Sequence, residues 1–330
     1  MNTEQLTKQA EAYELNSCII HQHGAVKFVY EKTPQASKEL LPVNSCTKSI
    51  LSALVCIALE KGQFPDPVKP VSAFFPELLH DKYDKNGRKQ RITVEHLFTM
   101  SAGFQWTEFG GSQSFPKMTR SPNWIRYVLK QPMADEPGAK WVYHSGVSQL
   151  VAAMLTQAVG MPIAQFARLH LFEPLGIQKF HWKTDPQGIH TGGFGMKLAA
   201  RDLVKFGLLY LERGMWNGRS IISADLVARS VSPAIAVPPP ERGFYGWHWW
   251  VDSTAVHHES EAAEGQLLDY FYARGYGGQF VFVVPGCEAV VVTTRERNKK
   301  GFSPHDLFRQ HIVPYLVQNQ QAPADGKSLG

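Results

Sequence analysis

The chain has 330 residues, of which 44% are hydrophobic and 19% charged, and its formal net charge is +5 at pH 7. These proportions are typical of a globular protein, and the length allows one large or two smaller domains. Lysines and arginines are dispersed among acidic residues, so the charge predicts no nucleic-acid partner, and no apolar run reaches the length of a membrane span.

The N-terminal ten residues lack the apolar segment of a secretory signal. Four cysteines occur at irregular spacing, which suits free thiols in a reducing compartment. We therefore expect a cytoplasmic protein without a membrane partner. The sequence leaves the oligomeric state open.

Residues 17–30 alternate in the manner of two strands around a turn at Gly24. His21 and His23 would fall on the same strand face, as two metal ligands could. No acidic ligand follows at the next alternate position, and His257 and His258 lie in a polar segment without ligand spacing. We predict no metal and no other cofactor.

Residues 44–62 predict a buried helix, because apolar residues fall on nearly every side and Gly62 provides a stop. Ser45 and Lys48 stand about one turn apart and therefore share a face. A serine hydroxyl becomes a strong nucleophile only when a base removes its proton, and a lysine can be that base when burial keeps it neutral. The pair predicts a nucleophile and its base.

The segment from Gln105 to Thr119 reads as a loop, and loops of this length often border a functional site. Trp106 is therefore a candidate for contact with the substrate. A second serine and lysine at the same spacing, Ser114 and Lys117, fall in this segment, where Pro116 would interrupt a helix. We expect this second pair to be a chance match.

Tyr143 ends a turn that precedes a predicted helix over residues 147–159. A tyrosine at such a junction is more often a packing residue with a polar tip. Ester or amide cleavage also needs a group that hands a proton to the leaving atom. Together with Ser45 and Lys48, Tyr143 is the candidate for that role.

The C-terminal third predicts a further helix and then several strands. The helix covers residues 198–211, the strands cover residues 246–251, 270–273, 279–284 and 289–294, and a last helix covers 304–317 before a tail expected to be disordered.

Gly277 and Gly278 lie between two of the predicted strands. Two adjacent glycines allow a backbone to approach a bound group closely, so the amides of Ser45 and Gln279 could form an oxyanion hole. The alternative is a glycine-rich bulge that only connects the strands.

Three stretches together resemble the motifs of the serine β-lactamase and penicillin-binding protein superfamily. Ser45-Cys46-Thr47-Lys48 matches S-x-x-K, Tyr143-His144-Ser145 occupies the place of Y-x-N, and Tyr276-Gly277-Gly278 occupies the place of K-T-G. The resemblance spans most of the chain and is nearest to the class C β-lactamase-like esterases and the 6-aminohexanoate-dimer hydrolases. It implies Ser45 as acyl-forming nucleophile, Lys48 as its base and Tyr143 as proton relay.

The chain departs from these motifs at two positions. Ser145 replaces an asparagine, and Tyr276 replaces the lysine that would attract a substrate carboxylate. His190-Thr191-Gly192 is closer to K-T-G in letters, but it precedes a predicted helix and ranks second. The residues expected to contact a substrate are Ser145, Trp106, Tyr276, Gly277 and Gly278.

The resemblance implies an α+β fold of the β-lactamase and transpeptidase type, with an antiparallel sheet flanked by helices and an inserted helical region. Residues 1–64 and 241–330 would form the sheet domain, and residues 65–240 a mostly helical domain. The active site would lie in the cleft between them. The G-x-S-x-G elbow of α/β-hydrolases is absent from the sequence.

We expect a serine hydrolase that cleaves small carboxylic esters or amides through an acyl-enzyme on Ser45. One alternative is a β-lactamase or D-alanyl-D-alanine carboxypeptidase, for which a β-lactam would be a ligand. Another is a non-catalytic ligand sensor of the penicillin-binding type. Ser45, Lys48 and Tyr143 together favour turnover, because a pure binder would need none of the three.

Overall fold

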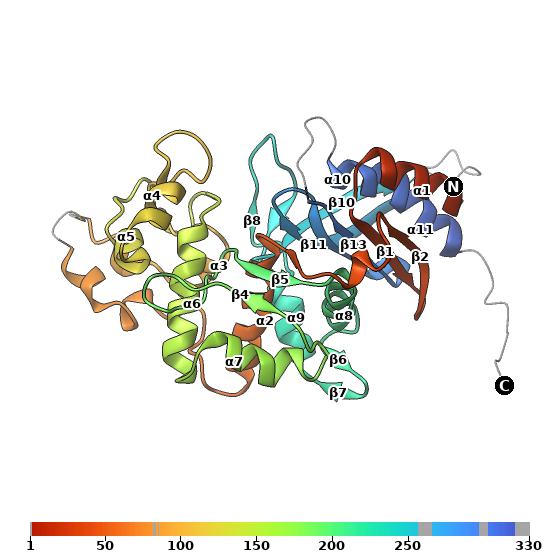
Figure 1. The fold of residues 1–330 in the computed structure, drawn as a ribbon. Helices are drawn as coiled ribbons and strands as arrows, with labels where there is room; N and C mark the ends of the chain where they lie inside the picture. The colour runs from red at the N-terminus through yellow and green to blue at the C-terminus, as the bar shows by residue number, and fades with distance from the viewer. Residues whose placement is uncertain (1, 82–83, 85, 257–265, 297–302, 321–330) are drawn as a thin grey trace.

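A computed structural model describes residues 2–81, 84, 86–256, 266–296 and 303–320 (Figure 1). His257, His258 and the tail after residue 320 lie outside the described residues.

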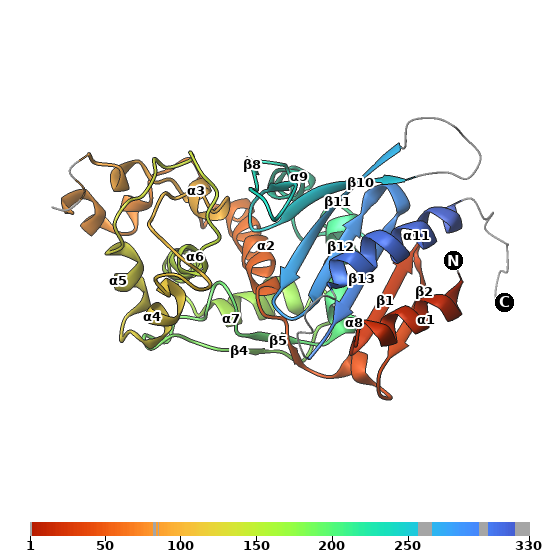
Figure 2. The same cartoon turned by 90° about the horizontal axis from the view of Figure 1, so that it is seen from above.

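An eight-stranded antiparallel sheet forms one side of the molecule (Figures 1 and 2). Strands from the two ends of the chain meet where β1 pairs with β13, with Ser17 opposite Thr294. The strand order across the sheet is β2 (Ala25–Glu31), β1 (Ser17–Gln22), β13 (Ala289–Thr294), β12 (Gln279–Val284), β11 (Gln266–Gly275), β10 (Trp250–Val256), β9 (Phe244–Tyr245) and β8 (Ile235–Ala236).

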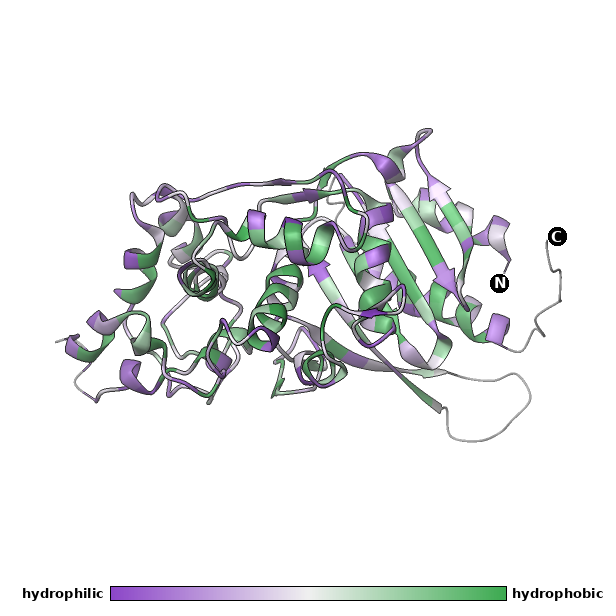
Figure 3. Ribbon diagram, turned by 90° about the horizontal axis from the view of Figure 1, so that it is seen from below, coloured by the Kyte–Doolittle hydropathy of each residue, from purple (hydrophilic) through white to green (hydrophobic). Residues whose placement is uncertain are grey.

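Helices cover both faces of this sheet. Its central strands are hydrophobic (Figure 3) and buried along their whole length, and successive side chains of a strand point to opposite faces, so both faces need cover. Phe282 packs against Phe308, while the neighbouring Val281 lies opposite Gly207 on the other face. One face carries α1 (Thr3–Ala12), α10 (Pro304–Leu307) and α11 (Val313–Gln320), and the other carries α8 (Ala200–Leu211) and α2 (Cys46–Glu60).

Helix α2 lies between the sheet and the helical part of the chain (Figure 2). Every residue from Cys46 to Ala58 is buried, as the all-round apolar pattern predicts. One side of α2 contacts β11 and another side contacts α6, so the start of the helix is fixed by both parts of the molecule.

Short elements fill the rest of the described chain. The helices are α3 (Val94–Phe98), α4 (Ser114–Arg120), α5 (Trp124–Leu129), α6 (Ser145–Val159), α7 (Ile163–Ala167) and α9 (Ala224–Ser230). Two small sheets contain β3 (Leu41–Pro42), β5 (Met196–Leu198) and β4 (His181–Trp182), and β6 (Met215–Trp216) with β7 (Arg219–Ser220).

The fold class predicted from the sequence is confirmed: a large antiparallel sheet is combined with helices. The division into domains at residues 64/65 and 240/241 stays a prediction. Two elements from the central region join the sheet side, since β8 is a sheet strand and α8 packs on β12 and β13.

Three local predictions are wrong. Ser114 to Lys117 begins helix α4 instead of lying in a loop, because Pro116 falls in the first turn, where a helix does not need its N–H groups. His23 leaves β1 for a turn with φ of 49°, so it does not share a strand face with His21. Residues 246–249 leave the sheet, and the strand begins at Trp250.

No helix among the described residues has by itself the length and hydrophobicity of a membrane span. The two segments Ser145–Val159 and Ile163–Phe172 are long and hydrophobic enough only when they are counted as one, and a bend of 75° separates them.

Candidate active site

Ser45 lies at the N-cap of α2, where a serine hydroxyl usually caps the helix. Here it makes no capping bond and instead accepts a hydrogen bond from Lys48 Nζ at 3.2 Å. The preceding Asn44 has φ of 48° and donates from Nδ2 to the carbonyl of Tyr276 at 2.6 Å. The turn before α2 is thus tied to the sheet and leaves the Ser45 hydroxyl available for chemistry.

Lys48 is 1% exposed and has three hydrogen-bond acceptors around its ammonium group. Besides Ser45 Oγ, Nζ donates to Ser145 Oγ at 2.9 Å and to the carbonyl of Gly193 at 2.8 Å. An ammonium group has three N–H donors and no acceptor, so these contacts satisfy its charged form completely. The predicted nucleophile and base are therefore adjacent, as the helical spacing requires.

Tyr143 places its ring beside the same ammonium group, with Nζ 4.7 Å from the ring centroid. The ring also stacks on Trp250 of the sheet at 6.1 Å. Among the described residues, the hydroxyl of Tyr143 has no hydrogen-bond partner. The structure thus brings the three predicted catalytic residues together, and the role of the phenol as proton relay stays a prediction.

Glu108 is the functional candidate that sequence reasoning missed. It is 8% exposed, and its Oε2 accepts hydrogen bonds from Trp106 Nε1 at 2.7 Å and from the Ser145 amide at 2.9 Å. Its Oε1 accepts a short hydrogen bond from the Ser145 hydroxyl. All three groups donate, as an ionised carboxylate requires. In the sequence, Glu108 is indicated only by its position in the predicted loop that contains Trp106.

Trp106 lies inside the protein instead of on the rim of the site. Its side chain is 6% exposed and stacks on His144 at 3.7 Å. Contact between Trp106 and a substrate is therefore not supported. Because the ring is buried, its indole N–H needs an acceptor, and Glu108 provides it.

His144 is held neutral within this layer. Burial, followed by the nearby charge of Lys48, lowers the pKa of His144 well below its usual value. Its Nδ1 accepts the amide hydrogen of Val147 and so caps α6. His144 is accordingly a structural residue between Tyr143 and Ser145.

Ser145 is directed toward Lys48 and Glu108. It is 2% exposed, and its hydroxyl bridges Lys48 and Glu108. The expectation that it contacts a substrate is therefore not supported. This position suits a small side chain, because Gly193 lies directly against Ser145.

The second-ranked K-T-G segment also reaches the site, but by its backbone. A Cβ on Gly192 would lie 2.0 Å from the carbonyl oxygen of Ser148, so only glycine allows the loop to approach α6 this closely. The loop presents the carbonyl of Gly193 to Lys48. No sequence pattern predicts this contact, because every residue has a backbone carbonyl.

The turn between β11 and β12 lies beside the start of α2. A Cβ on Gly275 would lie 2.3 Å from the carbonyl oxygen of Val43, so glycine permits the close approach. Cys46 Sγ donates to the carbonyl of Gln279 at 3.5 Å, and the Ser45 amide has no acceptor among the described residues. This arrangement puts the backbone of Gln279 next to Ser45, and the oxyanion role of both amides stays a prediction.

Two large exposed aromatic side chains lie close to each other near the turn that binds Asn44. Phe109 follows Glu108 and is 71% exposed, and Tyr276, whose carbonyl binds Asn44, is 63% exposed. Their ring centroids are 6.3 Å apart. Tyr276 therefore lies at the rim as expected, while Gly277 and Gly278 adopt positive φ in the same turn.

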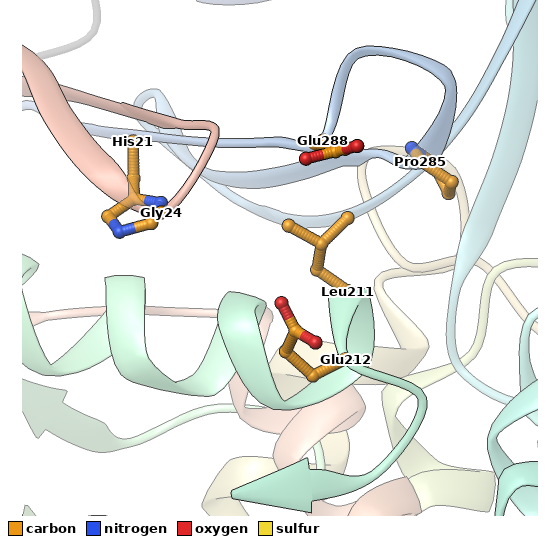
Figure 4. A pocket seen from close by; sticks show the side chains of 6 residues that line it. All are labelled: His21, Gly24, Leu211, Glu212, Pro285 and Glu288. Carbon is orange, nitrogen blue, oxygen red and sulfur yellow. The ribbon is translucent and has the colours of Figure 1, made fainter. Parts of the chain in front are cut away.

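A separate hollow between β1, the end of α8 and the β12–β13 connection contains His21, Glu212 and Glu288 (Figure 4). His23 reaches Glu288 from outside, with 3.2 Å between Nδ1 and Oε2. Within the described residues, no group of three histidine, cysteine or acidic side chains could hold a metal ion. The lining of this hollow includes none of the residues around Ser45 and no serine, cysteine or lysine.

The fold has close structural relatives. A putative 6-aminohexanoate-dimer hydrolase from Bacillus anthracis superposes with a TM-score of 0.77 at 18% identity, covering 96% of this chain and 82% of the other. EstCE1, described as a hydrolase with promiscuous acyltransferase activity, superposes with a TM-score of 0.74 at 15% identity, covering 95% and 97%. At these identities the likeness shows the fold.

The sequence has relatives of the same kind. The 6-aminohexanoate-dimer hydrolase of Paenarthrobacter ureafaciens is 20% identical over 225 residues, which is 62% of this chain and 56% of that protein. The family model described as Beta-lactamase matches residues 19–312, which include Ser45, Lys48, Tyr143 and Gln279. Because that match spans most of the chain and the fold agrees with it, the protein belongs to the beta-lactamase family, within the superfamily of serine β-lactamases and penicillin-binding proteins.

Proposed function

We propose that the protein is a serine hydrolase that cleaves small carboxylic esters or amides through an acyl-enzyme on Ser45. The observation that carries this proposal is the 3.2 Å contact between Lys48 Nζ and Ser45 Oγ at the start of a buried helix. A hydroxyl held against a basic group is the arrangement that nucleophilic catalysis needs. Family members and structural relatives are mostly hydrolases, which supports an enzymatic role.

Each residue around Ser45 has a role in such a reaction. Ser45 Oγ attacks the carbonyl carbon while its proton passes to Lys48, and the amides of Ser45 and Gln279 stabilise the oxyanion. The Tyr143 hydroxyl gives a proton to the leaving oxygen or nitrogen. Water then attacks the acyl-enzyme by the reverse path and releases the acid.

The rim favours a substrate with an apolar part and no required charge. Phe109 and Tyr276 offer two exposed neighbouring rings, and the carbonyl of Tyr276 binds Asn44, the residue before Ser45. Arg274, the cation nearest to Tyr276 in sequence, is already paired with Glu241 at 2.6 Å. Short acyl chains and small linear amides match this surface better than a substrate that depends on a carboxylate contact.

The test is covalent labelling of Ser45. A fluorophosphonate probe should add one phosphonyl group to each protein chain, detected by intact mass, and peptide mapping should locate the group on Ser45. The labelled protein should lose its activity toward a nitrophenyl ester in proportion to the adduct. Labelling at another serine, or full ester turnover after complete modification of Ser45, would contradict the proposal.

A further inference from the structure

We propose that Glu108 accepts the proton that leaves Ser45, with the hydroxyl of Ser145 and the ammonium of Lys48 as the carriers between them. The proposal rests on Ser45 being the nucleophile. It makes Glu108 a positioning and proton-accepting residue that acts through Ser145, because the carboxylate does not itself touch Ser45.

In its ammonium form, Lys48 cannot accept a proton from Ser45. Its three N–H groups point to Ser45 Oγ, Ser145 Oγ and the Gly193 carbonyl, which accounts for every donor of an ammonium ion. A lone pair on Nζ appears only when one of these hydrogens has been transferred away. The site must therefore contain an acceptor for it.

Only one of the three contacts of Lys48 leads to such an acceptor. Ser45 Oγ is the nucleophile, and a carbonyl such as that of Gly193 has no hydrogen to pass on. Ser145 Oγ accepts from Lys48 Nζ at 2.9 Å and donates its own hydrogen to Glu108 Oε1. Since Ser145 and Glu108 are 2% and 8% exposed, this transfer path lies inside the protein.

The proton transfers balance without any further reactant. Lys48 gives a proton to Ser145 Oγ while Ser145 gives its hydroxyl proton to Glu108 Oε1, which leaves a neutral lysine and a neutral carboxylic acid. As the bond from Ser45 Oγ to the carbonyl carbon forms, the Ser45 proton moves to Lys48. The net result is a proton on Glu108, and the charge that disappears from the carboxylate appears on the oxyanion.

Four buried titratable groups around Lys48 and Glu108 are held in their neutral forms. These are Cys46, His144, His248 and Tyr245, and the ring of Tyr143 also lies beside Lys48. Burial, followed by the charge of Lys48, lowers the pKa of both histidines well below the usual value. Burial raises the pKa of the Cys46 thiol and of the Tyr245 phenol. The acid side of a pH profile should therefore report the Lys48–Glu108 pair.

Removing the Glu108 carboxylate distinguishes a proton acceptor from a purely structural residue, because the two roles predict opposite shifts in the pH dependence of the labelling rate. If Glu108 accepts the proton, the wild-type rate falls at acid pH only when the pair takes up a second proton. In Glu108→Gln, Lys48 must release its proton to solvent. The pH at which the rate decreases on acidification should therefore rise by about one unit or more. If Glu108 only supports the fold, loss of its negative charge makes Lys48 release a proton more readily, and the fall stays or moves down.

The experiment measures the rate constant of fluorophosphonate labelling at Ser45 by intact mass between pH 5 and pH 9. Fluoride leaves this probe without needing a proton, so the rate reports activation of Ser45 and not the Tyr143 step. Glu108→Gln should label roughly tenfold or more slowly at pH 7 than the wild type, with the acid fall displaced upward. Ser145→Ala interrupts the same path and should shift the profile in the same direction.

Glu95→Gln is the matched control, because Glu95 also accepts an indole hydrogen, from Trp247 Nε1 at 3.0 Å, and has no contact with Lys48. It should keep the wild-type profile. Thermal unfolding shows whether Glu108→Gln and Ser145→Ala are folded. If one of them is not, the pH profile of the other tests the proposal. If the pH at which the rate decreases is unchanged or lower in the folded variants, the proton transfer to Glu108 is refuted, and Ser45 remains the nucleophile. Absence of Ser45 labelling in the wild type would overturn both proposals.

Discussion

At the residue scale, the environment of the hydroxyl decides which serine of α2 can react. Ser45 Oγ contacts Lys48, whereas Ser52 Oγ, two turns along the same helix, is buried without a hydrogen-bond partner. The two serines thus share a helix and a chemical group and differ in their neighbours. They form a natural pair of test and control.

Ser45→Ala should lower kcat for a nitrophenyl ester by on the order of 10³-fold or more, because no nucleophile remains to form the acyl-enzyme. Ser52→Ala removes a hydroxyl that binds nothing among the described residues, so its kcat and its thermal midpoint should match those of the wild type. Steady-state kinetics on the purified variants checks both values. Unchanged turnover in Ser45→Ala would refute the assignment of the nucleophile.

Tyr143 combines a packing role and a chemical role that one substitution separates. Tyr143→Phe keeps the ring beside Lys48 and against Trp250 but removes the hydroxyl. An amine leaving group needs a proton and a nitrophenolate does not, so amide turnover should fall roughly 10²-fold or more while ester turnover falls much less. Comparing kcat on an anilide and on a nitrophenyl ester tests this. Equal losses on the two substrates would speak against proton donation by Tyr143.

At the element scale, the site depends on how closely the end of β11 approaches the chain before α2. Gly275→Ala would place a methyl group 2.3 Å from the carbonyl oxygen of Val43, so the two segments must separate. We expect kcat to fall roughly tenfold or more, because the amides of Ser45 and Gln279 would lose their mutual placement. The free energy of unfolding should fall by about 1–3 kcal/mol.

Gly286→Ala is the control for this prediction. Gly286 also lies beside the sheet, but the nearest atom to its added methyl group is the flexible end of Leu268 at 3.1 Å. Its kinetics should therefore remain those of the wild type. If Gly275→Ala keeps full activity, the approach of β11 to Val43 does not position the site.

Helix α10 makes stability depend on pH through one buried histidine. Burial, followed by the charge of Arg274, lowers the pKa of His305 from 6.5 to about 4. Between these values the unfolded chain binds a proton at His305 and the folded chain does not, so stability is full above pH 6.5 and falls as the pH drops toward 4. His305 stacks on Phe282 and makes a tilted ring contact with Tyr272 of the sheet, and a phenylalanine could keep both contacts.

His305→Phe should therefore reduce the loss of unfolding free energy between pH 6.5 and pH 4 by roughly 2–3 kcal/mol. The loss of the hydrogen bond between His305 Nε2 and the Tyr270 hydroxyl should cost the same at every pH. Urea unfolding at several pH values measures both effects. A wild-type and a variant curve that stay parallel over this range would contradict the assignment.

At the scale of the whole molecule, the site is assembled from segments that are far apart in the chain. The start of α2, the loop at Glu108, the start of α6, the loop at Gly193 and the turn at Tyr276 all meet around Lys48 and Ser45. The position that would hold the lysine of K-T-G carries Tyr276, which has no cationic group. Tyr276 itself therefore gives a substrate carboxylate no charge-assisted contact of the kind a lysine would give.

We expect kcat/KM for a nitrophenyl ester to exceed that for a chromogenic cephalosporin by a wide margin. The missing charge-assisted bond is worth about 1.5–3 kcal/mol, or roughly tenfold or more. Tyr276→Lys should improve the cephalosporin relative to the ester by a similar factor, and Tyr276→Phe should not. A clear wild-type preference for the cephalosporin would establish β-lactam hydrolysis as the better description.

The sequence alone determined the features that depend on neighbours along the chain. The bounds predicted for two central strands, residues 279–284 and 289–294, are confirmed as β12 and β13. The apolar pattern of residues 44–62 predicted the buried helix, and a spacing of three residues put Ser45 and Lys48 on one face. These properties follow from backbone geometry and hydrophobic periodicity, which short segments encode by themselves.

The tertiary structure alone decided which polar groups complete the site. Lys48 finds Ser145 at a distance of 97 residues along the chain and Gly193 at 145, and Glu108 finds Ser145 at 37. A glutamate in a polar loop has the same local pattern whether it faces solvent or a buried hydroxyl, and Trp106 looked like a rim residue for the same reason. Burial and hydrogen-bond partners arise only when distant segments pack together, so Glu108, Gly193 and the inward role of Ser145 became visible only in the folded chain.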